Sequence, residues 1–409
     1  MATNNNDKTL NVPPLRFPEF SGEWEEHTLS EYLEFKNGLN PDAKRIGSGL
    51  PFISVMDILS EGVINYDNIR GKVNATEKEI ECFGVKDGDL LFQRSSETLE
   101  DVGRANVYMD NRTAIYGGFV IRGRKIGNYD PLFFKYLLAT PLARKRTCRM
   151  GAGAQHFNIG QEGLSKISLY FPSIEEQRKI AGFLSLIDER IATQNKIIEK
   201  LQSLIKGLND NIHKGIKGET VCFSDLGEAY SGLSGKGGDD FGYGEPFITY
   251  MNVYQNTYIS EKDYELVQIA PNEKQNSVQY GDALFTLSSE TPEEVGIGAV
   301  YLGNTQKLYL NSFCFGIHFY DERVLPQYLA HFISSSSFRR AIYPLAQGST
   351  RFNLQKNDFM KMKFLLPSLE KQGHIANTLD ALHCRLANEK SLTEQYILLK
   401  KYLLSLMFI

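Results

Sequence analysis

Two long stretches of the chain carry apolar residues at steps of four and three. The first runs from Ile180 to Ile212 and is interrupted at Gln194, and the second runs from Ile375 to Leu406 with Glu389 at the matching position. Such spacing over more than four heptads predicts coiled-coil helices. A short step from Glu389 to Leu392 predicts a stammer, which locally overwinds a coiled coil. We expect the following seam residues to pair the helices or to contact partners: Ile180, Leu184, Ile187, Ile191, Gln194, Ile198, Leu379, Leu382, Leu386, Glu389 and Leu399.

Both stretches begin with related motifs. Phe171-Pro-Ser-Ile-Glu-Glu-Gln-Arg-Lys-Ile-Ala opens the first, and Leu366-Pro-Ser-Leu-Glu-Lys-Gln-Gly-His-Ile-Ala opens the second, 195 positions later. Ser173 followed by Glu176 predicts a capping box at the helix start. The polar pair Gln194 and Glu389 is expected to fix the register of the coiled coil or to open a contact for partners.

The regions that precede the two helices repeat each other. Pro51-Phe-Ile matches Pro246-Phe-Ile, Ser95-Ser-Glu-Thr matches Ser288-Ser-Glu-Thr, and Phe157-Asn-Ile matches Phe352-Asn-Leu. Short β-type runs, such as a strand over Ala114–Ile121, alternate with turns and with a helix that starts at Asp130-Pro131. The matched segments lie 195, 193 and 195 positions apart, and such a repeat predicts one structural unit used twice.

These patterns predict an α+β chain of two tandem mixed α/β regions, each followed by a long helix. The two helices are expected to pair as an antiparallel coiled coil about a pseudo-two-fold axis. The expected parts are a tail and anchor over 1–23, with 1–14 disordered; a first globular region over 24–173; a helix over 174–217; a second globular region over 218–368; and a helix over 369–409.

Composition narrows the class of protein. The formal net charge of −4 argues against a non-specific nucleic-acid binder. The five cysteines are scattered without a C-x-x-C motif, which favours a reducing compartment over a disulfide framework or a zinc site. The N-terminus lacks the pattern of a signal peptide, and no apolar run reaches the length of a membrane span. A cytoplasmic protein without a metal site is therefore expected.

One segment is strongly basic although the whole chain is acidic. From Arg112 to Arg149 the chain has nine arginines and lysines and a single acid, Asp130. A local basic face of this kind could bind phosphates, and DNA binding through it would fall steeply with salt. The alternative, a solvated helix face balanced by acids elsewhere, stays open at this stage.

Catalytic motifs are missing from the sequence. The chain has no [DN]-P-P-[FYW] motif, no phosphate-binding G-x-x-x-x-G-K-[ST] loop, no H-E-x-x-H and no G-x-S-x-G. The glutamates of the two Ser-Ser-Glu-Thr segments lack a nearby partner for acid–base chemistry, so an orienting role in a loop is the preferred interpretation. We therefore expect no catalytic residue and no cofactor bound by this chain.

The repeated polar loops suit recognition of nucleic acid. Arginine can donate two hydrogen bonds to guanine, glutamine pairs with adenine, and serine reaches base or phosphate. Plain turns are the alternative for any single position. The candidate DNA-binding residues are Gln93, Arg94, Ser95, Ser96, Arg104, Arg122, Arg124, Gln155, His156, Ser288, Ser289, Gln347, Thr350 and Arg351.

The paired helix starts, the two diverged units and the entry segment Leu15-Arg-Phe-Pro-Glu-Phe resemble the specificity (S) subunit of Type I restriction–modification systems. The resemblance covers the chain from Leu15 onward. It implies two target recognition domains that each read part of a bipartite site in double-stranded DNA. It also implies a coiled coil that sets the spacer and docks two methyltransferase subunits, which bind S-adenosylmethionine and methylate adenine, with restriction subunits joining for cleavage.

The resemblance further implies that the chain itself is not an enzyme. A different class of function stays open from the residues alone: a protein-interaction scaffold whose two globular regions bind peptides or proteins, for which the negative net charge is suitable. Nucleic-acid dependence of partner capture would distinguish the two.

Overall fold

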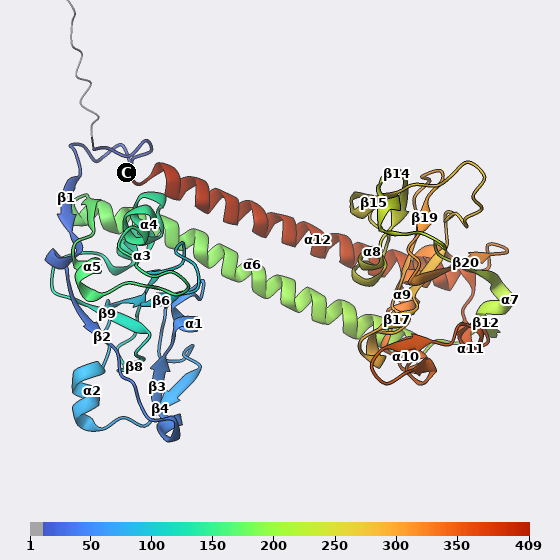
Figure 1. Ribbon diagram of the computed structural model, residues 1–409, viewed down its shortest axis with the longest axis horizontal. Helices are drawn as coiled ribbons and strands as arrows, with labels where there is room; N and C mark the ends of the chain where they lie inside the picture. Colours follow the sequence, from blue (N-terminus) through green and yellow to red (C-terminus); the bar gives the residue numbers. More distant parts are fainter. Residues whose placement is uncertain (1–10) are drawn as a thin grey trace, which may run out of the picture. The chain divides into compact units, whose positions relative to one another are not determined.

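The computed structural model describes residues 11–409, which separate into two compact units. Unit 1 comprises the chain up to Asn195 together with Ser391–Ile409, and unit 2 comprises Lys196–Lys390. Each unit therefore takes part of both long helices, α6 (Ile174–Lys214, green in Figure 1) and α12 (Leu369–Leu406, red). Residues 1–10 of the predicted tail lie outside the described residues.

Unit 1 is built on a four-stranded antiparallel sheet in the order β2-β9-β5-β7, with a three-stranded sheet β4-β3-β8 and the pairs β1-β11 and β6-β10. Its strands are β1 (Glu25–Thr28), β2 (Leu33–Asn37), β3 (Ile46–Ile53), β4 (Gly71–Val73), β5 (Leu90–Gln93), β6 (Ser95–Ser96), β7 (Ala105–Val107), β8 (Ile115–Tyr116), β9 (Val120–Lys125), β10 (Phe157–Asn158) and β11 (Ser168–Phe171). Its helices before α6 are η1 (Leu29–Glu31), η2 (Ala43–Arg45), α1 (Val55–Ile58), α2 (Glu77–Phe83), α3 (Pro131–Ala139), α4 (Pro141–Cys148) and α5 (Gln161–Ser165).

Unit 2 repeats this arrangement. Its four-stranded sheet has the order β13-β20-β16-β18, its three-stranded sheets are β15-β14-β19 and β17-β22-β21, and β12 pairs with β23. The strands are β12 (Glu219–Cys222), β13 (Gly227–Ser231), β14 (Phe241–Ile248), β15 (Tyr264–Val267), β16 (Ala283–Thr286), β17 (Ser288–Ser289), β18 (Gly298–Val300), β19 (Tyr309–Leu310), β20 (Cys314–Phe319), β21 (Ala346–Gln347), β22 (Phe352–Leu354) and β23 (Lys363–Leu366). The helices are α7 (Phe223–Leu226), η3 (Gly238–Asp240), α8 (Tyr250–Gln255), η4 (Glu261–Asp263), η5 (Pro292–Glu294), α9 (Pro326–Ile333), α10 (Ser336–Ile342), η6 (Tyr343–Leu345) and α11 (Lys356–Met360).

Local sequence explains several element boundaries in unit 1. The helix expected after Asp130 is α3, in which the Asp130 carboxylate accepts a hydrogen bond from the amide of Phe133 at 2.8 Å and Pro131 occupies the first turn. The single strand expected over Ala114–Ile121 is wrong. The chain forms β8 and β9 with a turn at residues 117–119, because Val120 N bonds back to Gly117 O.

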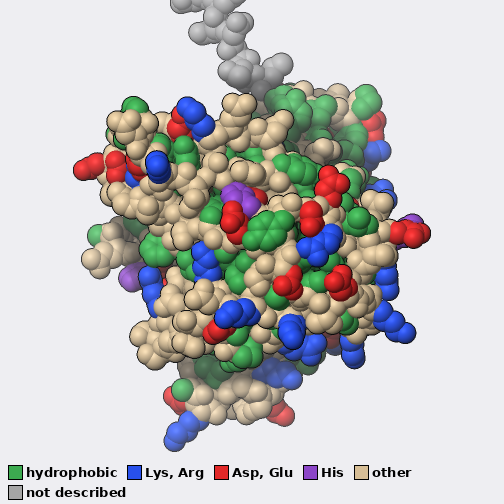
Figure 2. Space-filling model, turned by 90° about the vertical axis from the view of Figure 1, so that its right-hand side faces the viewer, with side chains coloured by type: hydrophobic (Ala, Val, Ile, Leu, Met, Phe, Trp, Pro, Cys, Tyr) green, Lys and Arg blue, Asp and Glu red, His purple; other side chains and the backbone are tan. Residues whose placement is uncertain are grey.

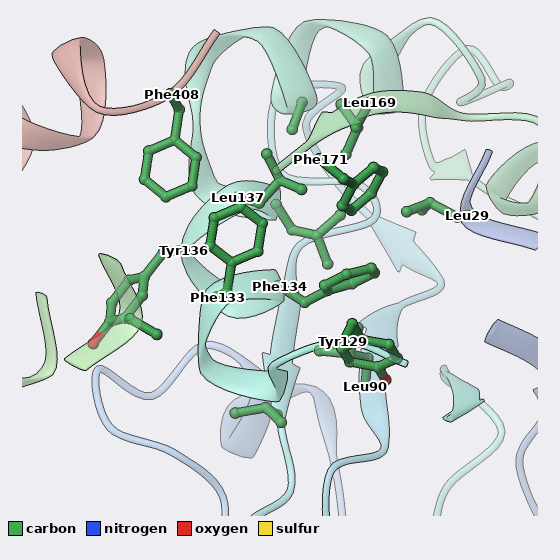
Figure 3. Close-up of a cluster of buried hydrophobic side chains, with 14 of the residues drawn as sticks. Leu29, Leu90, Tyr129, Phe133, Phe134, Tyr136, Leu137, Leu169, Phe171 and Phe408 are labelled. Atoms are coloured by element: carbon green, nitrogen blue, oxygen red, sulfur yellow. The ribbon is translucent and has the colours of Figure 1, made fainter. Parts of the chain in front are cut away.

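The core of unit 1 joins the sheet to both long helices. Phe133 and Phe134 of α3 pack with Phe171 of β11, and Phe408 at the chain end packs against Phe133 with ring centroids 5.4 Å apart (Figure 3). Ile180 and Leu184 of α6 belong to the same buried cluster. Burying aromatic and aliphatic side chains is the main source of stability for such a region.

The pairing of the two helices is confirmed within each unit. In unit 1 the first half of α6 shares a core with the last part of α12, through Leu184 and Leu403. In unit 2 the last part of α6 shares a core with the start of α12, through Leu208 and Leu379. Opposite ends of the helices therefore meet, so they run antiparallel (Figure 1).

The predicted stammer in α12 is wrong. Leu392 and Leu399 are exposed, at 37% and 43%, whereas Thr393 and Leu403 are buried and Tyr396 is half-buried. The buried positions continue in steps of three and four from Glu389 to Leu403. The heptad spacing thus persists although three of its positions, Glu389, Thr393 and Lys400, are polar, and Leu399 lies outside the seam.

The start of α6 is capped differently from the prediction. The hydroxyl of Ser173 accepts a hydrogen bond from the Glu176 amide at 3.3 Å, as expected. The Glu176 carboxylate instead binds the Arg16 guanidinium through two contacts of 2.7 Å. The entry segment is therefore anchored on α6. The disorder expected up to residue 14 is also wrong for its described part, since Asn11 O accepts from the Trp24 amide at 2.8 Å.

Unit 2 has a buried histidine where unit 1 has Phe408. His213 at the end of α6 lies between Tyr328 and Phe332, with each pair of ring centroids 5.6 Å apart, and bonds Asn209 O through Nδ1 at 2.9 Å. Its Nε2 is buried without a hydrogen-bond partner. Burial lowers the pKa of His213, and the nearby His331 lowers it further. The neutral imidazole is therefore the form that this core accepts.

His213→Phe should stabilise unit 2 and weaken its dependence on pH. Because the folded pKa of His213 is lowered, the unfolded chain binds its proton more readily, and stability falls as the pH drops below about 6.5. Thermal unfolding of the full chain between pH 5 and pH 7.5 measures this effect. The exposed His374 offers a control, His374→Phe, that should leave the pH dependence unchanged. An unaltered pH slope in His213→Phe would show that His213 is not responsible.

Candidate nucleic-acid interface

The fold of unit 1 brings two separate polar segments together. β6 pairs with β10, so that Ser95 faces Asn158 and Ser96 faces Phe157. The Ser95 hydroxyl also bonds the Asn158 side chain. A bridge between Ala152 and Asn158 closes the intervening loop. The two candidate segments, which the sequence could only name separately, therefore form one surface.

Unit 2 builds the same surface from the equivalent residues. β17 pairs with β22, so that Ser288 faces Asn353 and Ser289 faces Phe352, and β21 adds Gln347 opposite Asn353. The loop in each unit requires glycine. Gly153 and Gly348 have φ of +143° and +141°, and a Cβ there would lie about 2 Å from the carbonyl oxygen three residues on. We call the two surfaces platform 1 (residues 93–97, 119 and 151–158) and platform 2 (residues 286–290, 313 and 346–353).

Each platform also carries an exposed phenylalanine that sequence reasoning missed. Phe119 is 68% exposed and its carbonyl accepts from the amide of Arg94 at 2.9 Å; Phe313 is 54% exposed and accepts from Leu287 at 2.8 Å. The position could have been found by extending the repeat, because the two phenylalanines directly precede the equivalent strands β9 and β20. Exposed aromatic side chains of this kind can stack on bases or contact the thymine methyl group.

The candidate residues of platform 1 are not equally available. Gln155 and His156 are exposed. Gln93 is buried and donates to Ser95 O at 2.9 Å, which orients β6. Arg94 is half-buried and reaches Gly118 O at 3.4 Å, while the exposed Arg104 is paired with Asp101 at 2.6 Å. In unit 2, Ser288 and Ser289 are half-buried, and Gln347, Thr350 and Arg351 are exposed.

Two of the arginines predicted to contact DNA are bonded within the fold. Arg122 is 6% exposed, donates to Gly84 O at 2.9 Å and lies over the ring of Tyr116. Arg124 also donates to Gly84 O, at 2.6 Å, and lies 3.4 Å from the buried carboxylate of Asp89. Arg122 and Arg124 lie on the same side of β9, and Gly84, which follows α2, accepts a hydrogen bond from each of them.

The basic run from Arg112 to Arg149 does not form one face. Most of its charges bind groups within unit 1: Arg112 with Asp67 and Asp110, Lys125 with Tyr129 O, Lys135 with Glu61 O, Arg144 with Glu100 O and Val102 O, and Arg146 with Glu26. Figure 2 shows a face of unit 2 and not this run, and on that face basic and acidic side chains are interspersed. Most basic side chains of this segment bind acceptors inside unit 1. The structure therefore does not support the predicted phosphate-binding face.

Platform 2 borders a hollow of about 380 Å³. The rings of Tyr250 and Tyr254 form one wall, stacked at 6.0 Å. Tyr254 donates to the Glu294 carboxylate at 2.6 Å, and Ser289 donates to its other oxygen at 3.1 Å. The bond from Tyr254 is the main cause that lowers the pKa of Glu294, which therefore carries a negative charge at neutral pH. Met251, Glu290, Phe313 and Arg351 complete the lining.

Among residues 11–409, no group of histidine, cysteine and acidic side chains is arranged to hold a metal ion. None of the helices in this range is long and apolar enough to cross a bilayer. Five free cysteines lie apart from one another.

Known proteins share both the sequence pattern and the fold. A family model described as "Type I restriction modification DNA specificity domain" matches residues 21–203 and, a second time, residues 218–395. The type I restriction enzyme MjaVIII specificity subunit of Methanocaldococcus jannaschii is 22% identical over 423 residues, which cover 96% of this chain and 93% of the relative.

Two solved structures extend over nearly the whole chain. The S subunit of a Type I restriction–modification system from M. genitalium covers 97% of this chain and 99% of its own, with a TM-score of 0.56 and 13% identity. A chain from a structure on complex assembly and conformational transition of the type I R-M system covers 96% and 98%, with a TM-score of 0.59 and 14% identity. The predicted fold of two tandem mixed domains with paired long helices is thereby confirmed.

Proposed function

This chain belongs to the family of type I restriction modification DNA specificity proteins, and we propose that its two units each read one half of a bipartite DNA target. Proteins of this family are specificity subunits, the non-catalytic parts of restriction–modification complexes, and their function is recognition of DNA sequence. What we propose beyond this is that each unit reads a different half-site.

The repeated geometry of the platforms carries this proposal. Both units pair a Ser-Ser segment with a Phe-Asn segment in the same register and present a phenylalanine beside it. The exposed side chains around this frame differ, with His156 in unit 1 where unit 2 has Arg351. Base contacts specify sequence, whereas a shared frame can set the approach to the duplex. A common frame with different polar groups suits two different half-sites.

The paired helices are proposed to set the distance between the half-sites and to dock the catalytic subunits. In this proposal the partners are double-stranded DNA, two methyltransferase subunits that bind S-adenosylmethionine, and restriction subunits in the full complex. Exposed apolar side chains on the helices, such as Leu186 of α6 and Leu398 of α12, supply contact area for protein partners. Leu399, displaced from the seam, belongs with this outer surface.

Exchanging residues 24–173 for the matching region of a relative with another specificity tests the proposal. The complex should then recognise a target in which one block has changed and the other is unaltered. Exchanging 218–368 should change the other block. Selection of bound duplexes from a random library measures both blocks. A change in both blocks after one exchange would contradict separate reading by the two regions.

A further inference from the structure

The hollow beside platform 2 has a chemical character that unit 1 lacks. Its stacked wall of Tyr250 and Tyr254 corresponds in the repeat to Val55 and Leu59. Glu294, which Tyr254 and Ser289 orient, corresponds to Asp101, which pairs with Arg104. Glu97 of unit 1 corresponds to Glu290, so each unit has this exposed carboxylate. The hollow of unit 2 differs from the equivalent place in unit 1 by its tyrosine wall and by Glu294, which has no arginine partner.

Glu290 is the carboxylate in this hollow that is free to bind. It is exposed and makes no hydrogen bond or ion pair with any other residue of the described chain, in contrast to the fixed carboxylate of Glu294. Two carboxylates repel phosphate and accept hydrogen bonds without donating any. Flat aromatic walls favour a planar ligand. The two carboxylates and the tyrosine wall therefore favour a flat ligand that carries N–H donors.

We infer that this hollow reads a base with an exocyclic amino group, cytosine or adenine, in the half-site of unit 2. The inference rests on the proposed function of the platforms. The Glu290 carboxylate accepts from the amino group, Tyr254 supplies the apolar wall, and Arg351, which also lines the hollow, can bind a phosphate. Guanine and thymine present the acceptors O6 and O4 at the same edge in the major groove, and the carboxylate repels both.

Glu290→Ala in the full chain, assembled with its methyltransferase partner, tests this assignment. The preference for cytosine or adenine at one position of the unit 2 block should fall by about 5- to 150-fold, the factor that corresponds to ~1–3 kcal/mol of base discrimination. Affinity for unrelated DNA should rise, because a negative charge is removed from the interface. Tyr254→Leu, which installs the residue type of unit 1, should weaken the same preference.

Glu293→Ala is the matched control, since Glu293 is exposed nearby but does not line the hollow. It should leave the preference intact. If Glu290→Ala retains the full preference, or loses affinity equally for all sequences, the inference is overturned while the proposed function stands. If the unaltered chain with its partner shows no sequence preference at all, the proposed function fails and the inference falls with it.

Discussion

Replacing Arg124 by methionine should lower the free energy of unfolding of unit 1 by about 3 kcal/mol. The substitution removes the guanidinium nearest to the Asp89 carboxylate, which is 1% exposed, and leaves that charge inside the fold. Burial already raises the pKa of Asp89, while Arg124 opposes the rise. Without Arg124 the pKa should rise further, so the folded state holds the proton more tightly than the unfolded chain does.

The sign of the pH effect follows from this shift. A group whose folded pKa is raised stabilises the fold at low pH, and that stability is lost as the pH rises through the folded pKa. Arg124→Met should therefore be most destabilised at neutral pH and should recover on acidification. Arg104→Met is the matched control, because its pair with Asp101 is largely exposed and should contribute less than about 1 kcal/mol. Denaturant unfolding measures both losses of stability. Equal losses in the two variants would show that the buried pair contributes no more stability than the exposed pair.

Lengthening both long helices by one heptad should abolish recognition of the original target while keeping both half-sites. Seven residues added after Asn195 in α6 and after Lys390 in α12 preserve the seam and extend each helix by about 10 Å. Library selection should return the two original blocks with a longer gap. Adding the heptad to α6 alone is the control, since it leaves the seams unmatched and should prevent productive binding. If the gap is unchanged when both helices are lengthened, the helices do not set the distance between the half-sites.

The long helices were predictable because their signal is repeated and local. The heptad from Ile180 to Ile212 and the motif at Pro172-Ser173 needed no knowledge of tertiary contacts. In the second seam the prediction is wrong at Leu392 and Leu399, because an apolar side chain in a helix is not always buried. The structure buries Thr393 and exposes both leucines, since a regular helix keeps its phase even where a polar residue falls in the seam.

The platform residues were only partly predictable for a different reason. The Ser-Ser and Phe-Asn segments could be found as repeats, but their pairing depends on contacts between residues about 60 positions apart. The prediction that Arg122 and Arg124 contact DNA rests on residue type alone, because arginine can read bases. Such a side chain faces solvent or a buried carboxylate depending on the residues packed beside β9. Those residues are distant in the sequence, so a local pattern does not identify them. Phe119 was missed because a strand was predicted through its turn.

The most direct test of separate reading by the two platforms compares His156→Ala with Arg351→Ala. The two residues occupy equivalent positions, both are exposed, and neither is needed for the core. Selection of duplexes from a random library by the full complex should show that His156→Ala alters one block of the target and Arg351→Ala alters only the other. Alteration of the same block by both variants, or a target without two separable blocks, would contradict the account.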